Sequence, residues 1–389
     1  MDLPFYKLKP AIQNYSWGRK GKDSIIAKLI GETQNLNTTF AELWYGSHVK
    51  ASAEIWKENQ YLALTNLSLE EKQKLFGSKN NSLVFLLKIL SIAKSLSIQV
   101  HPDKTTAEKL HKDSPENYPD PNQKLEIAIA LTPVTMLHGF RNKDAVIRNI
   151  KSCPELAQLL AKDLLDDTKS CEAEFLKEVF SRIVTSDTKN AKNLQEKFLE
   201  RINKNKSCTT EEECVKNLCS EFPEGDAGVF LPLIMNLVSI QKNQAVVTKA
   251  NTPHAYLSGE LVECMTNSDN VVRAALTPKF KDVDTLISIT SFAPKEPELV
   301  SVKSKSDDIE YFDTGCVEFK MFKALASENK KQIDFVSTPA IIITTDSSFI
   351  ISTEHHSLKI EPGFAAFIPA ATSKFVLENV DGDCWIACS

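Results

Sequence analysis

The sequence predicts a mainly β protein with a helical insertion, and three observations lead to this fold class. Residues 1–139 alternate between strand-like runs and short connectors, as in "KLEIAIALTPVTMLHGF", where apolar residues recur with period 2. Residues 140–233 change to the period of amphipathic helices. Strand-like runs return from residue 234, and a faint internal repeat among them indicates two related β-barrels.

The helical block is identified by the spacing of its apolar residues. The segment "CEAEFLKEVFSRIV" places Phe175, Val179, Phe180 and Ile183 on one helix face, and charged residues fill the other faces. The segment "NAKNLQEKFLERI" has the same pattern. We therefore expect residues 140–233 to form a helical insertion that lines or shields one side of a cleft.

The internal repeat relates "VVTKANTPHAYL" (246–257) to "FIPAATSKFVL" (367–377) and places His254 opposite Lys374. A protonated lysine has no lone pair for a metal ion, so we expect the second barrel to be metal-free.

The predicted domains are a first barrel from residues 1–139 and 234–303, the insertion 140–233, and a second barrel from residues 304–389. The polar stretch "SVKSKSDDIEYF" is expected to be a linker.

The composition excludes several classes of protein. The chain has 389 residues, of which 42% are hydrophobic and 25% charged, and its net charge is −5. An acidic balance argues against a nucleic-acid-binding protein. No apolar run approaches the roughly 18 residues of a membrane span, and the N-terminus lacks the apolar core of a secretory signal. We expect a cytoplasmic protein whose nine scattered cysteines are free thiols.

Polar residues share one face of a predicted strand in "LSIQVHPDK". Residues two apart in a strand point to the same side, so Gln99 and His101 face one way with Ser97. Ile98 and Val100 face the other way, into a core. A row of polar groups directed into a barrel is costly unless the groups bind something.

Two further segments supply donor groups. In "QKLEIAIAL" the carboxylate of Glu126 shares a face with small alanines, which leaves open space in front of it. His254 follows a proline in a tight corner. Together with Gln99 and His101 these residues offer two imidazole nitrogens and two oxygens, a set that suits Zn²⁺ or another first-row divalent ion. By spacing alone, they are equally well explained as hydrogen-bonded interior residues on unrelated strands.

Five segments in order resemble type I mannose-6-phosphate isomerases, from about residue 6 to residue 290: "YSWGRKGKDS", "FAELWYGSH", "LSIQVHPDK", "DPNQKLEIAIAL" and "HAYLSGELVECMTNSDNVVRAALTPK". The resemblance implies cupin-type (jelly-roll) barrels and one Zn²⁺ per chain, with the family's ligands at Gln99, His101, Glu126 and His254. It implies interconversion of mannose 6-phosphate and fructose 6-phosphate through a cis-enediol, feeding mannose and GDP-mannose metabolism. The expected partner is a sugar phosphate, with no nucleic acid or membrane, and the expected state is a monomer.

The same resemblance suggests roles for residues around the metal. Arg273 matches a catalytic arginine, although an arginine in a buried ion pair would look the same in sequence. Glu263 matches a proton-transferring base, and Lys124 and Asp269 share the candidacy for that role. Candidates for phosphate contacts are Lys88 and Ser97, for each of which a plain structural role is as good an explanation. Family pocket positions fall on Trp17, Glu42, His48 and Tyr256, of which Trp17 and Tyr256 also fit as core aromatics.

The sequence departs from the family pattern near the metal strand. Gln123 and Leu125 stand where the family usually has histidine and proline, and Ala275 replaces a glycine. The departures at Gln123 and Leu125 motivate one alternative, a non-catalytic sugar-phosphate-binding paralogue. A second alternative, an iron-dependent cupin oxygenase, is disfavoured by the additional Gln99 and the cationic pocket. The adjacent pair His355-His356 is expected at the surface.

Overall fold

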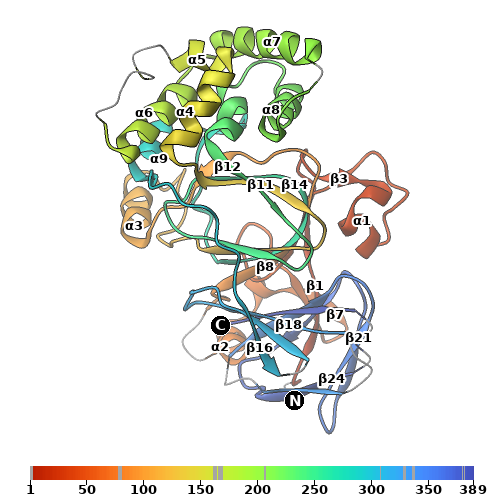
Figure 1. Cartoon of the computed structure of the whole chain (residues 1–389). Helices are drawn as coiled ribbons and strands as arrows, with labels where there is room; N and C mark the ends of the chain where they lie inside the picture. The colour runs from red at the N-terminus through yellow and green to blue at the C-terminus, as the bar shows by residue number, and fades with distance from the viewer. Residues whose placement is uncertain are drawn as a thin grey trace.

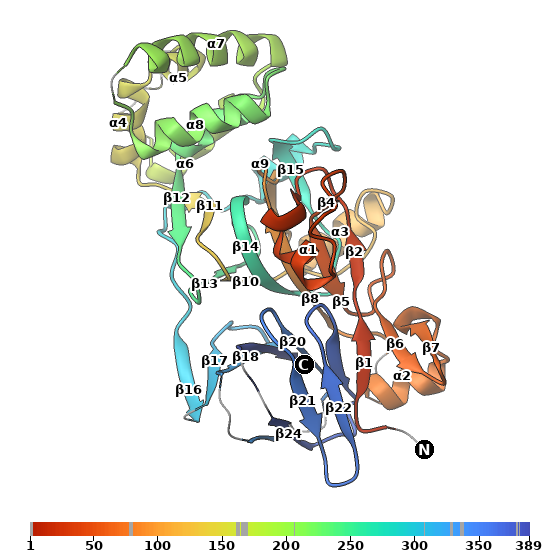
Figure 2. The same ribbon diagram turned by 90° about the vertical axis from the view of Figure 1, so that its right-hand side faces the viewer.

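The computed structural model describes residues 3–77, 81–160, 164, 170–205, 207–306, 308–326, 330–334, 338–378, 380 and 382–389. Three parts lie in a row: helices at one end, a β structure in the middle, and the C-terminal strands at the other end (Figure 1). The view turned by 90° has the same order (Figure 2). The predicted fold class, mainly β with a helical insertion, is confirmed.

The central part is a ten-stranded sheet organised around one long strand, β14 (His254–Thr266). The continuous order is β12-β11-β14-β8-β5-β2; β10 also pairs with β13 and β14, and β9 with β14 and β15. Every pairing is antiparallel. The other strands are β2 (Ala11–Gln13), β5 (Glu42–Tyr45), β8 (Phe85–Ile92), β9 (Ile98–Val100), β10 (Glu126–Ala130), β11 (Val134–Phe140), β12 (Met235–Ile240), β13 (Ala245–Thr248) and β15 (Val272–Ala275).

Alternation along these strands separates two buried faces. Ala128 and Tyr256 lie in one apolar cluster with Leu90, while Ile127 and Val262 lie in another with the C-terminal strands. Successive side chains of a strand point to opposite faces, so both faces of the sheet are covered here. The polar site described below occupies the end of the first of these two faces.

The predicted helical insertion is confirmed. It consists of α4 (Lys143–Ser152), α5 (Pro154–Leu160), α6 (Glu172–Val184), α7 (Thr188–Lys204), α8 (Thr210–Glu221) and the 3₁₀ helix η4 (Ala227–Leu233). Thr209 and Glu212 form a capping box that satisfies the free backbone amides at the start of α8. The face predicted for α6 is buried throughout, and Phe180 packs edge-on against Phe140 of β11. The insertion therefore shares its core with the central sheet.

The C-terminal part contains a nine-stranded sheet, in the order β16-β17-β18-β25-β20-β23-β1-β6-β7, and a four-stranded sheet, β19-β24-β21-β22. Three of these strands come from the N-terminal residues: β1 (Tyr6–Lys9), β6 (Glu54–Lys57) and β7 (Gln60–Ala63). The others are β16 (Val302–Ser306), β17 (Ile309–Phe312), β18 (Lys320–Ala324), β19 (Lys331–Asp334), β20 (Ala340–Thr344), β21 (Phe349–Ser352), β22 (Ser357–Ile360), β23 (Ala365–Ile368), β24 (Lys374–Glu378) and β25 (Cys384–Cys388).

The expectation of a linker at residues 301–312 was wrong. Residues 302–306 and 309–312 pair as β16 and β17, because Ile309 and Phe312 are buried between the clusters of the C-terminal part. The two residues aligned by the predicted repeat each begin a strand, His254 in β14 and Lys374 in β24. None of the described helices is long and apolar enough to cross a lipid bilayer.

The remaining elements are short, and β3 and β4 pair with each other in a separate two-stranded sheet. Ser68 caps the helix α2 through a capping box with Glu71. These elements are β3 (Arg19–Lys20), η1 (Gly21–Asp23), α1 (Ile25–Leu29), β4 (Thr39–Phe40), η2 (Leu64–Asn66), α2 (Leu69–Phe76), α3 (Lys104–Asp113) and α9 (Val283–Ile289).

One glycine allows β14 to pass β11. Gly259 has φ +119°, and a Cβ there would lie 2.7 Å from the Pro133 carbonyl oxygen and 2.8 Å from Val134 Cα. Gly31 also has a positive φ, +77°, but its Cβ would meet open space.

We expect Gly259→Ala to lower the free energy of unfolding by about 2–4 kcal/mol, measured by urea unfolding, because it adds a backbone clash to backbone strain. The matched control Gly31→Ala should cost only about 1 kcal/mol; equal losses would contradict this account.

Candidate metal centre and adjoining cavity

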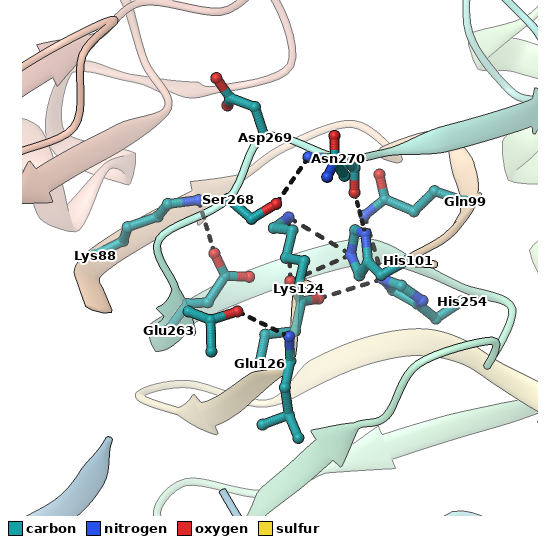
Figure 3. A network of polar contacts seen from close by, with 12 residues as sticks. Lys88, Gln99, His101, Lys124, Glu126, His254, Glu263, Ser268, Asp269 and Asn270 are labelled. Atoms are coloured by element: carbon teal, nitrogen blue, oxygen red, sulfur yellow. Dashed lines mark hydrogen bonds and ion pairs between the residues drawn. The ribbon is translucent and has the colours of Figure 1, made fainter. Parts of the chain in front are cut away.

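Donor groups from three strands meet in the interior of the central part, as Figure 3 shows. His101 Nε2 lies 3.4 Å from Glu126 Oε2, and His254 Nε2 lies 3.2 Å from Glu126 Oε1. The side-chain amide nitrogen of Gln99 is 3.2 Å from His254 Nε2. Strand pairing brings these groups together: Gln99 of β9 stands directly opposite His254 of β14, and Glu126 of β10 stands opposite Thr248 of β13, which shortly precedes His254 in the chain.

Backbone carbonyls fix both imidazoles. His101 Nδ1 is 3.0 Å from the Asn270 carbonyl, and His254 Nδ1 is 2.9 Å from the Thr252 carbonyl. A carbonyl only accepts hydrogen bonds, so each Nδ1 carries the proton and each Nε2 presents a lone pair. Both lone pairs face the Glu126 carboxylate. This is the arrangement in which histidine binds metal ions, with the outer nitrogen held by a hydrogen bond.

The electrostatics favour a cation at this point. Burial lowers the pKa of His101 to about 3, assisted by the charge of Lys124. Burial by itself would raise the pKa of Glu126, but Lys124 and His101 outweigh it and hold the pKa well below its ordinary value. Near neutral pH the centre therefore contains the charged Glu126 carboxylate and a neutral His101 imidazole.

The Glu126 carboxylate has an unfilled acceptor. Its Oε2 is buried and makes no well-directed hydrogen bond within the described chain, although Lys124 Nζ lies 3.2 Å away. The ligand atoms of His101, Glu126 and His254 all lie within 4.8 Å of one another, and no other such group is found among the described residues. A buried carboxylate that lies between two imidazole Nε2 atoms, with one oxygen lacking a hydrogen bond, fits a metal ion. Gln99 would join through its oxygen after a half-turn of its amide, since an amide nitrogen has no free lone pair.

A second buried polar cluster lies one strand away. Lys88 Nζ is 2.9 Å from Glu263 Oε2 and 3.6 Å from Glu42 Oε2. The Trp44 indole donates to Glu42. Burial raises the pKa of Glu263 above its ordinary value despite the opposing charge of Lys88. Burial would lower the pKa of Lys88, but Glu263 and Glu42 outweigh it and raise that pKa.

Asp269 and Arg273 differ in their pairing. Asp269 accepts from His48 Nε2 at 3.3 Å and from Lys50 Nζ at 2.9 Å. Burial would raise the pKa of Asp269, but these two neighbours hold it below its ordinary value. Arg273 forms no ion pair with any described carboxylate, so the buried-pair explanation of this residue is wrong. Burial lowers the pKa of Arg273, and its guanidinium remains available to an anion.

A cavity of about 560 Å³ connects these groups. Its wall contains most of the residues expected from the sequence, and His48 lies behind Asp269. His101, Glu126 and His254 are not part of the wall but contact the lining residues Gln99, Lys124 and Tyr256. A larger hollow of about 1140 Å³ over the C-terminal strands has no converging donor set within the described chain. The expected residues in the smaller cavity are Trp17, Glu42, Lys88, Ser97, Gln99, Lys124, Tyr256, Glu263, Asp269 and Arg273.

The sequence analysis missed several residues of the cavity wall. Lys279 stands beside Arg273 with its ammonium group 5.0 Å from the Tyr15 ring, and burial lowers its pKa. Lys279 ends the quoted segment "SDNVVRAALTPK", so its position after Arg273 was an available signal. Lys94, and Glu221 of the helical insertion, also line the cavity. No local pattern in the sequence connects them to this site.

The departures from the family pattern lie outside the donor set. Gln123 donates to Glu318 Oε1 at 3.0 Å, toward the C-terminal part. Leu125 packs against the cluster shared with the C-terminal sheet. Ala275 contacts the insertion, where a Cβ on Gly228 would lie 2.5 Å from the Ala275 Cβ. His355 and His356 are exposed, as predicted.

Comparisons with known proteins agree with this architecture. The family model described as "Phosphomannose isomerase type I, catalytic domain" matches residues 5–143, and "Phosphomannose isomerase type I, helical insertion domain" matches residues 150–235. The chain is 32% identical to a probable mannose-6-phosphate isomerase of Echinococcus multilocularis over 94% of both chains. It is 32% identical to the mannose-6-phosphate isomerase of Homo sapiens over 95% of this chain and 94% of the human one.

A solved structure of mannose 6-phosphate isomerase from Salmonella typhimurium, described as bound to its fructose 6-phosphate substrate and a zinc atom, has the same overall fold. It aligns with a TM-score of 0.87 and 27% identity over 99% of each chain. Both the sequence relatives and this structure extend over nearly the whole chain. The chain belongs to the type I phosphomannose isomerase family.

Proposed function

We propose that the protein is a zinc-dependent aldose–ketose isomerase that interconverts mannose 6-phosphate and fructose 6-phosphate. The observation that carries this proposal is the cluster of His101, Glu126 and His254, which lies directly behind the wall of a cavity lined with cations and contacts the lining residues Gln99 and Lys124. The Salmonella typhimurium structure is described with the corresponding metal and sugar phosphate. In this proposal the reaction connects fructose 6-phosphate with mannose and GDP-mannose metabolism.

The residues that would hold the metal are Gln99, His101, Glu126 and His254. The buried orphan oxygen of Glu126 and the two inward Nε2 lone pairs support this set. Tyr256 supports the carboxylate, since its hydroxyl lies 3.4 Å from Glu126 Oε1. A bound Zn²⁺ supplies Lewis-acid polarisation of the substrate oxygens at the reacting carbons.

The isomerisation moves a proton between C1 and C2 of the sugar through a cis-enediol, and Glu263 is our candidate for the base. Its carboxylate is buried beside the cavity and its pKa is raised by burial, as a proton carrier near neutral pH requires. Asp269 is a poorer candidate, because His48 and Lys50 stabilise its charged form. Lys124 Nζ lies 3.2 Å from Glu126 Oε2. There its positive charge stabilises the ionised carboxylate and the negative charge that develops on the enediol oxygens.

The unpaired cations of the cavity are our candidates for the anionic parts of the substrate. Arg273 can grip a phosphate or an enediolate with two parallel hydrogen bonds. Lys279 and Ser97 line the same cavity. Lys88 is less suited to the phosphate, because Glu263 and Glu42 already occupy its ammonium group. Trp17 supplies an apolar wall and stacks on Tyr15 with ring centroids 5.8 Å apart.

We keep the three-part division of the chain as a proposal: a metal-bearing barrel from residues 1–139 and 234–303, an insertion at 140–233, and a metal-free barrel from 304. The register of β1 with β23 adds one refinement, because residues 6–8 complete the C-terminal sheet. Limited proteolysis would therefore leave the N-terminal strands bound to the C-terminal fragment.

The direct test is a coupled assay for fructose 6-phosphate formed from mannose 6-phosphate, with and without a chelator. We expect turnover that the chelator abolishes and that added Zn²⁺ restores. Binding of the sugar phosphate without turnover would instead support the alternative of a non-catalytic paralogue.

Removing either imidazole should release the metal. We expect His101→Ala and His254→Ala each to lower zinc content well below one per chain and to reduce turnover by more than about a hundredfold, because each removes a neutral nitrogen ligand. Metal analysis and the coupled assay measure both effects. His355→Ala, a change at an exposed histidine, should alter neither. Full activity in metal-analysed His101→Ala protein would refute the site.

Arg273 should be needed for turnover but not for the metal. We expect Arg273→Ala to reduce kcat/KM by about a hundredfold or more while one zinc per chain is retained, since the guanidinium offsets substrate charge and is not one of the four proposed metal ligands. The exposed Arg148 of α4 provides the control Arg148→Ala, with unchanged kinetics. Loss of zinc in the Arg273 variant would show that this residue is structural.

The pairing of Glu263 with Lys88 predicts a pH effect. A base must be deprotonated, so turnover should fall as the pH falls through the raised pKa of Glu263. Lys88→Met removes the charge that opposes this rise, and we expect the acid limb of the kcat/KM profile to move to higher pH. Lys192→Met, which removes a lysine from an exposed ion pair with Glu224, should leave the profile unchanged. An acid limb that moves to lower pH in Lys88→Met would exclude Glu263 as the base.

A further inference from the structure

The helical insertion reaches the cavity through one short bend, residues 221–226, between α8 and η4. Glu221 and Phe222 of this bend line the cavity, although the insertion otherwise packs on the far side of the central sheet. Figure 1 shows the insertion standing over the end of that sheet. The contacts of the bend differ from ordinary domain packing, because they are made by carboxylates with the backbone of the cavity walls.

The first contact fixes the connector between β8 and β9. Glu221 Oε2 accepts from the Ser95 amide at 2.8 Å and from the Ser95 hydroxyl at 2.7 Å. Ser95 is only 8% exposed, and its amide finds no backbone acceptor in the described chain. Lys94 and Ser97, on either side of Ser95, both face the cavity. The position of this wall therefore depends on a carboxylate 126 residues away in sequence.

The position of Glu221 at the end of α8 indicates that its role is to bind Ser95 and not to stabilise the helix. Glu221 is the last residue of α8, where the negative end of the helix dipole disfavours a carboxylate. No ion pair of Glu221 with a lysine or arginine is found within the described ranges. The residue thus gives the helix no electrostatic benefit, and its hydrogen bonds go to Ser95.

The second contact fixes the opposite wall. Asp226 Oδ2 accepts from the Leu276 amide at 3.0 Å and from Lys281 Nζ at 3.1 Å, while its Oδ1 caps η4 through Gly228. Leu276 has φ +55°, a conformation that a leucine rarely adopts and that surrounding contacts must hold. Leu276 lies between Arg273 and Lys279, so the Asp226 carboxylate holds the backbone that carries both cations.

One buried side chain joins the two contacts. Gln195 of α7 is 4% exposed; its nitrogen donates to the Phe222 carbonyl at 3.1 Å and its oxygen accepts from the Asp226 amide at 3.0 Å. The bend is thereby fixed from within the insertion. Both cavity walls are held against the same rigid support.

We infer that Glu221 and Asp226 are positioning residues for the sugar phosphate: from one bend of the helical insertion they hold the two cation-bearing walls of the cavity at the separation that the phosphorylated substrate requires. This inference rests on the proposed function and deepens it. It makes the insertion part of substrate recognition, acting through Ser95 and Leu276.

The test compares Glu221→Ala, the isosteric Glu221→Gln and the control Glu224→Ala. Glu224 lies on the same bend but is 88% exposed and pairs with Lys192. We expect Glu221→Ala to raise KM for mannose 6-phosphate about five- to tenfold, with kcat changed less than about twofold and zinc content unchanged, because binding but not chemistry is lost. Glu221→Gln retains an acceptor oxygen and should keep KM within about twofold of the wild type. Asp226→Asn, which replaces one of the two acceptor oxygens by a donor, should raise KM in the same direction as Glu221→Ala.

Calorimetric binding of glucitol 6-phosphate, which has no carbonyl and cannot isomerise, gives a second readout on the zinc-loaded proteins. The same five- to tenfold weakening is expected for Glu221→Ala, with an unchanged melting temperature for Glu221→Gln. If the wild type turns over and Glu221→Ala matches Glu224→Ala in KM and in affinity, the inference alone is overturned. If the wild type binds this probe without turnover, the proposed isomerase function fails, and the loss of affinity in Glu221→Ala still supports the inference. A wild type that neither binds nor turns over overturns both.

Discussion

The structure depends on one buried negative charge, the carboxylate of Glu126. The Glu126 carboxylate is 1% exposed, and a buried carboxylate of this kind is stable only when opposite charge and hydrogen-bond donors replace its hydration. Lys124 supplies part of that charge, while the two imidazoles present lone pairs and so supply none. This imbalance is why the site suits a metal ion, because a divalent cation would satisfy the carboxylate and both nitrogens at once.

The cavity above this centre separates two kinds of cation. Lys88 and Lys50 are paired with the carboxylates of Glu263 and Asp269, and each lysine favours the charged form of its partner. Arg273 and Lys279 face the cavity beside each other, and burial lowers the pKa of both. A substrate that carries a dianionic phosphate at one end and a carbonyl at the other matches this division. The paired groups suit proton transfer, and the unpaired groups suit anion binding.

The strand faces of Gln99, His101 and Glu126 could be predicted from sequence because side-chain direction alternates along a strand, whereas spacing alone did not show that these residues converge with His254. Parity alone places Gln99 with His101 and separates Glu126 from Ile127, and the sheet keeps those faces. The crossing of β1 into the C-terminal sheet could not be predicted, because residues 6–8 pair with residues 365–367 at the other end of the chain and any apolar strand has the same local pattern. The contact of Glu221 with Ser95 was missed for the same reason: a glutamate at a helix end has no sequence signature for what it will bind.

Residue 123, one position where this chain departs from the family pattern, also shows how the entry of β10 is held. Gln123 directs its amide to Glu318, and its carbonyl accepts from the Thr266 hydroxyl at 2.8 Å, which in turn accepts from the Leu125 amide. These contacts fix the entry of β10 by joining it to β14 and to the C-terminal part. Gln123 therefore helps to fix the strand that carries Glu126. A glutamine can do this as well as a histidine, because the geometry of the donor set is determined by strand pairing and by the carbonyls behind His101 and His254.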